Sequence, residues 1–171
     1  MSQPLVALVG RPNVGKSTLF NRLIGERLAI VQDMPGTTRD RLYAPAQWAG
    51  HTFTVVDTGG LLPAPTDELT AQVQAQARLA IAEADVVVFL VDALAGLTPD
   101  DYAVAEVLRR SAKPVIVAAN KADNEERRLA AAEFYALGLE PLFAISALHG
   151  YETGDLLDAV VAAFPEAVEE E

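Results

Sequence analysis

Eight residues near the N-terminus have the types and the spacing that bind the phosphates of a nucleotide. They form the pattern Gly-x-x-x-x-Gly-Lys-Ser, which in this chain is Gly10-Arg11-Pro12-Asn13-Val14-Gly15-Lys16-Ser17, followed by Thr18. The two glycines allow the backbone to curl until several N–H groups point at one centre. Lys16 can reach the β- and γ-phosphates, and the Ser17 hydroxyl is suited to Mg²⁺. The pattern predicts a phosphate-binding P-loop.

The residues on either side of this pattern agree with that interpretation. Residues 5–9 are an apolar run typical of a buried strand, and residues 18–24 have apolar positions on one face of a helix. A helix that begins at this point adds its N-terminal dipole and its free N–H donors to the phosphate site. The alternative, an ordinary Gly-rich turn with a solvated lysine, does not account for both flanks.

Two further motifs are suited to the γ-phosphate and to Mg²⁺. Asp57-Thr58-Gly59-Gly60 ends the expected strand 52–57; Asp57 can hold Mg²⁺ through water, and Gly60 can offer its N–H to the γ-phosphate. Alone this motif is weak, because Asp and Gly are common in the turns that end strands. In the expected loop 28–41, the hydroxyl and carbonyl of Thr38 suit Mg²⁺ and the γ-phosphate, so this loop is expected to be ordered only while that phosphate is bound. The candidate catalytic residues are Lys16, Thr38 and Gly60, and the candidate Mg²⁺ ligands are Ser17, Thr38 and Asp57.

The motif Asn120-Lys121-Ala122-Asp123 predicts recognition of a guanine base. The Asp123 carboxylate can accept hydrogen bonds from the guanine N1–H and 2-amino groups, an arrangement that adenine lacks. A carboxylate that faced adenine would be left unpaired, which produces discrimination. The Lys121 stem can lie against the base, and Asn120 can tie this loop to the P-loop. A solvated polar loop is the alternative, and the preceding apolar strand and the P-loop disfavour it.

A last tripeptide, Ser146-Ala147-Leu148, follows the final expected strand, where the Ala147 N–H could meet guanine O6. The tripeptide is nonspecific by itself. The candidate nucleotide-binding residues are then Gly10, Arg11, Pro12, Asn13, Val14, Gly15, Lys16, Ser17, Thr18, Asp57, Thr58, Gly59, Gly60, Asn120, Lys121, Asp123, Ser146, Ala147 and Leu148.

The elements that must position these residues alternate along the chain. Strands are expected at residues 5–9, 42–48, 52–57, 85–92, 114–120 and 139–146, and helices at 18–24, 67–84, 98–110, 124–137 and 154–164. This order predicts an α/β fold with a mostly parallel six-stranded sheet, one antiparallel edge strand and helices on both faces. Ligands of such sheets bind at the carboxyl ends of the strands, which is where the motifs lie.

Composition limits the other possibilities. The chain of 171 residues suits one domain, expected at 1–165, with an acidic tail or the start of a linker at 166–171. The absence of cysteine excludes disulfides and thiolate metal sites, and the net charge of −11 argues against a broad nucleic-acid surface. Without a signal-peptide pattern or an apolar stretch of membrane-spanning length, a cytoplasmic location is expected.

The order of the motifs resembles the translation-factor-related Ras-like GTPases. More narrowly, residues 9–23 together with Pro35-Gly36-Thr37-Thr38-Arg39-Asp40-Arg41 and Asp57-Thr58-Gly59-Gly60-Leu61 are similar to the first G domain of the Der (EngA) family of bacterial GTPases. That resemblance implies a Ras-like G domain of the P-loop NTPase class, GTP as substrate, GDP as product and Mg²⁺ as cofactor. It also implies a role in assembly of the large ribosomal subunit, with contacts to its RNA through a full-length protein that adds a second G domain and a KH-like domain absent from this sequence.

Two residues within the motifs bear on the rate of hydrolysis. Ras-like enzymes usually have a glutamine after Asp-x-x-Gly to orient the attacking water, and here that position is Leu61, which predicts slow intrinsic hydrolysis. By the same resemblance, Asn13 matches the asparagine with which such GTPases bind K⁺ beside the phosphates. A regulatory guanine-nucleotide module with negligible turnover, and the G domain of an Era- or MnmE-type GTPase, remain alternatives. A general P-loop ATPase is disfavoured by residues 120–123.

Overall fold

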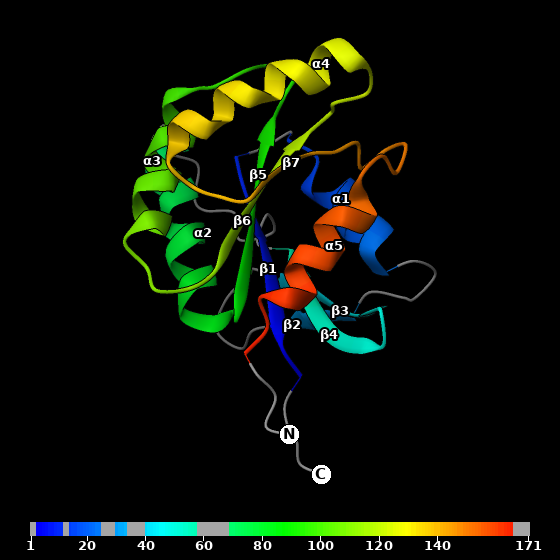
Figure 1. Ribbon diagram of the computed structural model, residues 1–171. Helices are drawn as coiled ribbons and strands as arrows, with labels where there is room; N and C mark the ends of the chain where they lie inside the picture. The colour runs from blue at the N-terminus through cyan, green and yellow to red at the C-terminus, as the bar shows by residue number, and fades with distance from the viewer. Residues whose placement is uncertain (1–2, 12–13, 25–29, 34–39, 58–68, 166–171) are drawn as a thin grey trace.

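One sheet with helices on both of its faces forms the molecule, as the computed structural model shows (Figure 1). The structure describes residues 3–11, 14–24, 30–33, 40–57 and 69–165. Its strands are β1 (Leu5–Val9), β2 (Ile30–Asp33), β3 (Asp40–Trp48), β4 (His51–Asp57), β5 (Val86–Asp92), β6 (Val115–Asn120) and β7 (Leu142–Ala144). Its helices are α1 (Lys16–Ile24), α2 (Leu69–Glu83), α3 (Pro99–Arg109), α4 (Glu125–Ala130), the 3₁₀ helix η2 (Ala131–Leu137) and α5 (Thr153–Ala162).

The strand order is β2-β3-β4-β1-β5-β6-β7, so β1 lies in the middle of the sheet. The pairs β1–β4, β1–β5, β5–β6 and β6–β7 are parallel, and β3 is antiparallel to β4. This arrangement confirms the mostly parallel sheet, with one antiparallel strand and covered faces, but the antiparallel strand β3 lies next to the edge strand β2 rather than at the edge itself. It also places the carboxyl ends of β1, β4, β5 and β6 at one edge of the sheet.

The described sheet has seven strands, one more than the six expected. The additional strand, β2, lies within residues 28–41, which were expected to form a loop, and pairs antiparallel with the first half of β3. A four-residue edge strand contains too few positions for a clear alternating pattern. Its pairing depends on a neighbouring strand that only the fold supplies.

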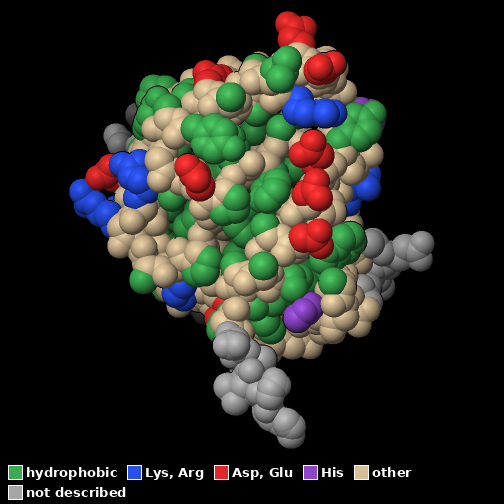
Figure 2. All heavy atoms as spheres, in the orientation of Figure 1, with side chains coloured by type: hydrophobic (Ala, Val, Ile, Leu, Met, Phe, Trp, Pro, Cys, Tyr) green, Lys and Arg blue, Asp and Glu red, His purple; other side chains and the backbone are tan. Residues whose placement is uncertain are grey.

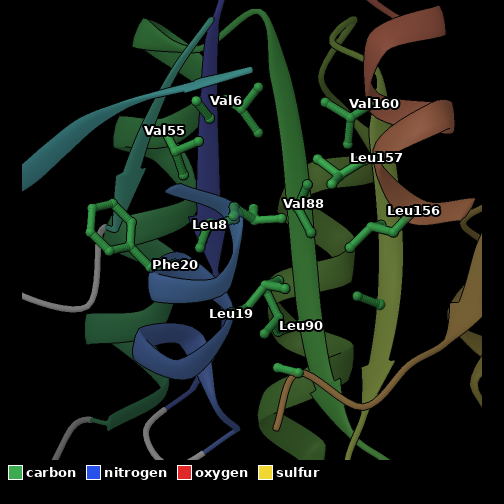
Figure 3. Close-up of a cluster of buried hydrophobic side chains, with 14 of the residues drawn as sticks. Val6, Leu8, Leu19, Phe20, Val55, Val88, Leu90, Leu156, Leu157 and Val160 are labelled. Atoms are coloured by element: carbon green, nitrogen blue, oxygen red, sulfur yellow. The ribbon is translucent and has the colours of Figure 1, made fainter. Parts of the chain in front are cut away.

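Alternation of side chains along the strands divides the core between the two faces. Val6 and Leu8 of β1 point toward α1 and α5, as do Val88 and Leu90 of β5 (Figure 3). The intervening residues, including Val9 and Phe89, pack with α2, α3 and η2 on the other face. Because both faces of the central strands are covered, these strands are apolar at every position, as is typical of parallel sheets.

Short-range sequence signals predicted where several helices begin. Thr98 caps α3 by accepting from the Asp101 N–H, while the Asp101 carboxylate accepts from the Thr98 N–H. The expected helix 124–137 begins as α4 but continues as the 3₁₀ helix η2. Its buried residues Ala131, Phe134 and Leu137 recur every three positions, which matches the three-residue turn of a 3₁₀ helix.

Acidic side chains form a row on the face shown in Figure 2, and basic side chains lie toward its margin. This distribution accords with the net charge of −11. Within the described ranges, no helix is both long and apolar enough to cross a membrane.

Candidate functional site

The described part of the P-loop connects the end of β1 to the start of α1, and Lys16 lies across it. The lysine Nζ donates to the carbonyl oxygens of Gly10 at 2.5 Å and of Arg11 at 3.1 Å, and only 8% of the residue is exposed. The ammonium is thereby held against the loop that was predicted to bind phosphate. Pro12 and Asn13 lie outside the described residues, so their expected roles stay predictions.

Burial lowers the pKa of Lys16 from its ordinary value. The Asp57 carboxylate opposes that shift by favouring the charged ammonium, and the Arg11 guanidinium adds to the lowering. A buried ammonium with insufficient negative charge around it is stabilised by an anion, and phosphate oxygens supply that charge.

We expect this shift to make stability depend on pH in a defined direction. Between the lowered pKa of folded Lys16 and the ordinary value of 10.5, the unfolded chain binds more protons than the folded chain. The free energy of unfolding of nucleotide-free wild type therefore rises with pH in that window relative to the Lys16→Met variant. Urea denaturation of both proteins from pH 7 into the alkaline range measures this difference. A difference that stays constant, or that falls with pH, contradicts the assignment.

The P-loop glycines are positions where another residue's backbone or side chain approaches closely. A Cβ on Gly10 would lie 2.7 Å from the carbonyl oxygen of Leu90 in β5. Gly15 has a φ of +103°, and a Cβ there would lie 2.1 Å from Nδ2 of Asn120. The positions of the two glycines thus coincide with close contacts to strand β5 and to Asn120, the last residue of β6.

Ser17 and Asp57 bring two hard oxygen ligands together beside the P-loop. The Ser17 hydroxyl, in the first turn of α1, lies 3.5 Å from Oδ2 of Asp57, the last residue of β4. A hydroxyl and a carboxylate suit Mg²⁺, which takes one or two protein ligands and completes its shell with water and substrate phosphates. No group of three or more His, Cys, Asp or Glu side chains that could hold a metal occurs in the described ranges. Thr38, Thr58, Gly59, Gly60 and Leu61 lie outside those ranges.

A pocket of about 210 Å³ lies beside the P-loop, at the carboxyl end of β6. Its lining combines three segments that are far apart in the chain: Gly15, Thr18, Asn120, Lys121, Asp123, Ser146 and Leu148. Asn120 joins these segments, since its Nδ2 donates to the Val14 carbonyl at 2.8 Å and its Oδ1 accepts from the Ala147 N–H at 2.9 Å. The predicted tie between this loop and the P-loop is present in the structure.

Asp123 has one engaged carboxylate oxygen and one without a partner. Oδ2 lies 3.2 Å from Nη1 of Arg127, one turn along in α4. Oδ1 is buried and has no hydrogen-bond partner among the described residues. A buried carboxylate oxygen without a donor is costly, and a ligand N–H group in the pocket would satisfy it.

Lys121 is held by an acidic residue that the sequence patterns did not single out. Its Nζ lies 3.0 Å from Oδ2 of Asp92, the last residue of β5. Burial alone would raise the pKa of Asp92, but hydrogen bonds from the Ala95 N–H, from Lys121 and from the Leu94 N–H outweigh it and lower the pKa. The ammonium is therefore fixed at the neighbouring strand end while the residue lines the pocket. The sequence signal that could have identified Asp92 is its position directly after the apolar run 86–91, at the carboxyl end of a strand.

Ala147 differs from its expected role in one respect. Its N–H, expected to meet guanine O6, donates in this structure to Asn120 Oδ1. Its neighbour Ser146 is fully buried, and the Ser146 hydroxyl accepts from the His149 N–H at 3.1 Å. The loop after β7 is thus held in place by its own hydrogen bonds and by Asn120.

Two arginines also contact the site through bonds that sequence reasoning missed. The Arg11 Nε lies 3.3 Å from Oδ1 of the buried Asp101, which joins the P-loop to the first turn of α3. Arg22 of α1 donates to the carbonyls of Ala147 and Leu148. Neither contact has a sequence signal, because each partner lies ninety residues or more along the chain.

Residues 5–121 match the family model described as "50S ribosome-binding GTPase". The chain belongs to this family. Membership in this GTPase family agrees with the convergence of the P-loop, Asp57 and the 120–123 loop at one edge of the sheet, and with the Ras-like fold.

Individual proteins show the same relationship. The chain is 61% identical over 170 residues to "GTPase Der" of Symbiobacterium thermophilum, an alignment that covers 99% of this chain and 36% of that protein. The structure of Aquifex aeolicus Era bound to GDP·AlF₄⁻ matches with a TM-score of 0.72 at 32% identity, over 98% of this chain and 58% of Era. The G domain of the T. maritima FeoB iron transporter matches with a TM-score of 0.70 at 28% identity, over 94% of this chain and 98% of that domain. The chain thus spans little more than a third of the length of the Der relative.

Proposed function

We propose that this chain is a guanine-nucleotide switch domain that binds GTP and hydrolyses it to GDP and phosphate. The observation that carries the proposal is the pocket beside the P-loop, where Asp123 Oδ1 is buried without a hydrogen-bond partner among the described residues. The N1–H and 2-amino groups of guanine are donors suited to this carboxylate, whereas adenine presents no such pair. The neighbouring Gly15 and Lys16 then receive the phosphates of the same nucleotide.

At the phosphate end, each residue has a separate task. Lys16 holds its ammonium toward the loop where the β- and γ-phosphates bind, and its burial strengthens the attraction. Ser17 and Asp57 are the described residues that would hold Mg²⁺. When bound, Mg²⁺ neutralises charge on the β- and γ-phosphate oxygens. Thr38 and Gly60 are proposed to bind the γ-phosphate, so the segments that contain them would respond to its loss.

Hydrolysis is expected to be slow without K⁺. Leu61 offers no donor or acceptor for the attacking water, and Asn13 is proposed to bind K⁺ beside the phosphates, where it would supply positive charge to the transition state. In single-turnover assays with GTP and Mg²⁺, we expect roughly tenfold or greater acceleration in KCl over NaCl at equal ionic strength, on the order of what one added transition-state charge provides. Equal rates in the two salts contradict the K⁺ site.

The same assay separates this proposal from a binding module without turnover. Production of GDP and phosphate at a rate above that of the Lys16→Met variant supports the GTPase. Tight GTP binding with no hydrolysis in either salt supports a regulatory module. Displacement of GTP by equimolar ATP overturns the guanine assignment altogether.

We also propose that the domain acts within a longer, cytoplasmic protein whose partner is the large ribosomal subunit and its RNA. The support is the family description and the 61% identity to a Der protein of which this chain spans 36%. The acidic character of this domain suggests that the RNA contacts belong to other parts of such a protein, including a second G domain and a KH-like domain.

A further inference from the structure

Arg22 is not among the candidate phosphate- or base-binding residues, yet it contacts the 146–148 segment that lines the proposed base pocket. It is in the last turn of α1, the helix that begins with Lys16. Its Nε donates to the Ala147 carbonyl at 2.5 Å and its Nη2 donates to the Leu148 carbonyl at 3.0 Å. One guanidinium therefore holds two consecutive carbonyl groups of the segment 146–148.

The absence of a side chain at Gly150 leaves space for the Arg22 guanidinium. A Cβ on Gly150 would lie 2.7 Å from Nη1 of Arg22, and Gly150 has a φ of +83°, which favours glycine. The Gly150 N–H donates to the Ser146 carbonyl at 2.7 Å, so the chain turns back tightly after Leu148. The glycine thus leaves space for the arginine as well as forming the turn.

The Ala147 residue is held at both of its backbone polar groups. Asn120 Oδ1 accepts from its N–H, and Arg22 donates to its carbonyl. These two bonds tie it to the 120–123 loop on one side and to α1 on the other. Because a peptide plane is rigid, fixing the Ala147 N–H sets the direction of the Ser146 carbonyl, and fixing the Ala147 carbonyl sets the direction of the Leu148 N–H.

We propose that Arg22 is a positioning residue for base selection: it holds the 146–148 segment so that this segment can meet the 6-oxo group of the base. The inference rests on the proposed guanine-nucleotide function. In that function Asp123 pairs with N1–H and the 2-amino group. The 6-oxo group of the base is then left to the wall of the pocket that the 146–148 segment forms. That wall includes Ser146 and Leu148, on either side of the residue that Arg22 holds.

The test compares two nucleotides that differ at this position of the base. GDP carries the 6-oxo group, whereas 2-aminopurine riboside diphosphate keeps the 2-amino group but lacks both the 6-oxo group and the N1–H. The affinity of each nucleotide for the variant is therefore compared with its own affinity for the wild type. We expect Arg22→Gln to weaken GDP binding by about tenfold, the effect of losing hydrogen bonds from a charged donor. The affinity for the 2-aminopurine nucleotide should change by less than about twofold, because the 6-position contact is already missing. Arg22→Lys, which keeps one charged donor, should recover part of the GDP affinity.

Controls make each result decisive. Arg110→Gln removes an exposed arginine at the end of α3 that pairs with Glu106, and it should leave both affinities unchanged. Equal weakening of both nucleotides by Arg22→Gln, or no weakening of either, overturns the positioning role. Failure of the wild type to bind GDP overturns the proposed function instead, so the two failures are distinguishable. Thermal unfolding of each variant checks that the fold is retained.

Discussion

Asp123→Asn is expected to change the base preference of the domain from guanine to xanthine. The variant loses the negative charge that is proposed to accept from the guanine N1–H and 2-amino groups. Its amide can instead donate to the 2-oxo group of xanthine. We expect GDP affinity to fall by roughly 100-fold or more, since hydrogen bonds to a charged group contribute about 1.5–3 kcal/mol each. XDP affinity should rise until XDP is the preferred diphosphate. Equilibrium competition among GDP, XDP and ADP measures both changes.

The effect is expected to be large because Asp123 Oδ1 is buried and has no hydrogen-bond partner in the part of the chain that the structure describes. An exposed carboxylate would be hydrated in the free protein, and its loss would change affinity little. Asp155→Asn, an exposed acid at the start of α5, removes the same charge away from the pocket and should leave all affinities unchanged. Retained guanine preference in Asp123→Asn would show that the pocket does not bind the base.

Gly15→Ala is expected to abolish nucleotide binding and to destabilise the fold. The new Cβ would lie 2.1 Å from Asn120 Nδ2, and the residue would keep a φ of +103° that L side chains rarely adopt. Relief of this contact moves Asn120 away from both the Val14 carbonyl and the Ala147 N–H. We expect a loss of about 2–4 kcal/mol in the free energy of unfolding, as is typical when a buried hydrogen-bond network breaks. GDP affinity should fall more than 100-fold, beyond the effect of losing one hydrogen bond.

Gly50→Ala is the matched control for that variant. Gly50, in the β3–β4 turn, also has a positive φ of +84°, but a Cβ there would meet nothing within 4 Å. Its cost should be backbone strain alone, about 1 kcal/mol, with normal GDP affinity. Urea denaturation and GDP titration of both variants separate the strain from the contact with Asn120. Normal nucleotide binding by Gly15→Ala would show that the link between the P-loop and Asn120 is dispensable.

Local patterns in the sequence were sufficient for most of the architecture. Strands that are covered on both faces need apolar side chains at every position. Continuous apolar runs such as 86–91 therefore predicted the central parallel strands. The cap at Thr98 is likewise local, and so is the end of η2 at Gly138, a glycine with a φ of 77° whose N–H donates to the Tyr135 carbonyl. Both involve hydrogen bonds between residues within four positions of each other. β2 was missed because an edge strand of four residues depends on its neighbour more than on its own composition.

Motifs within the sequence determined which residues are proposed to bind phosphate and base, because the required chemistry leaves few residue types able to serve. Only the tertiary structure decided what holds them in position. Arg22 and the 146–148 segment, Lys121 and Asp92, and Arg11 and Asp101 are pairs separated by 29 to 126 positions, as their residue numbers show. A hydrogen bond between distant residues leaves no spacing pattern, since any exposed arginine has the same local sequence signal whether or not a carbonyl lies opposite. The fold supplies that carbonyl by bringing strand ends and helix α1 to the same edge of the sheet.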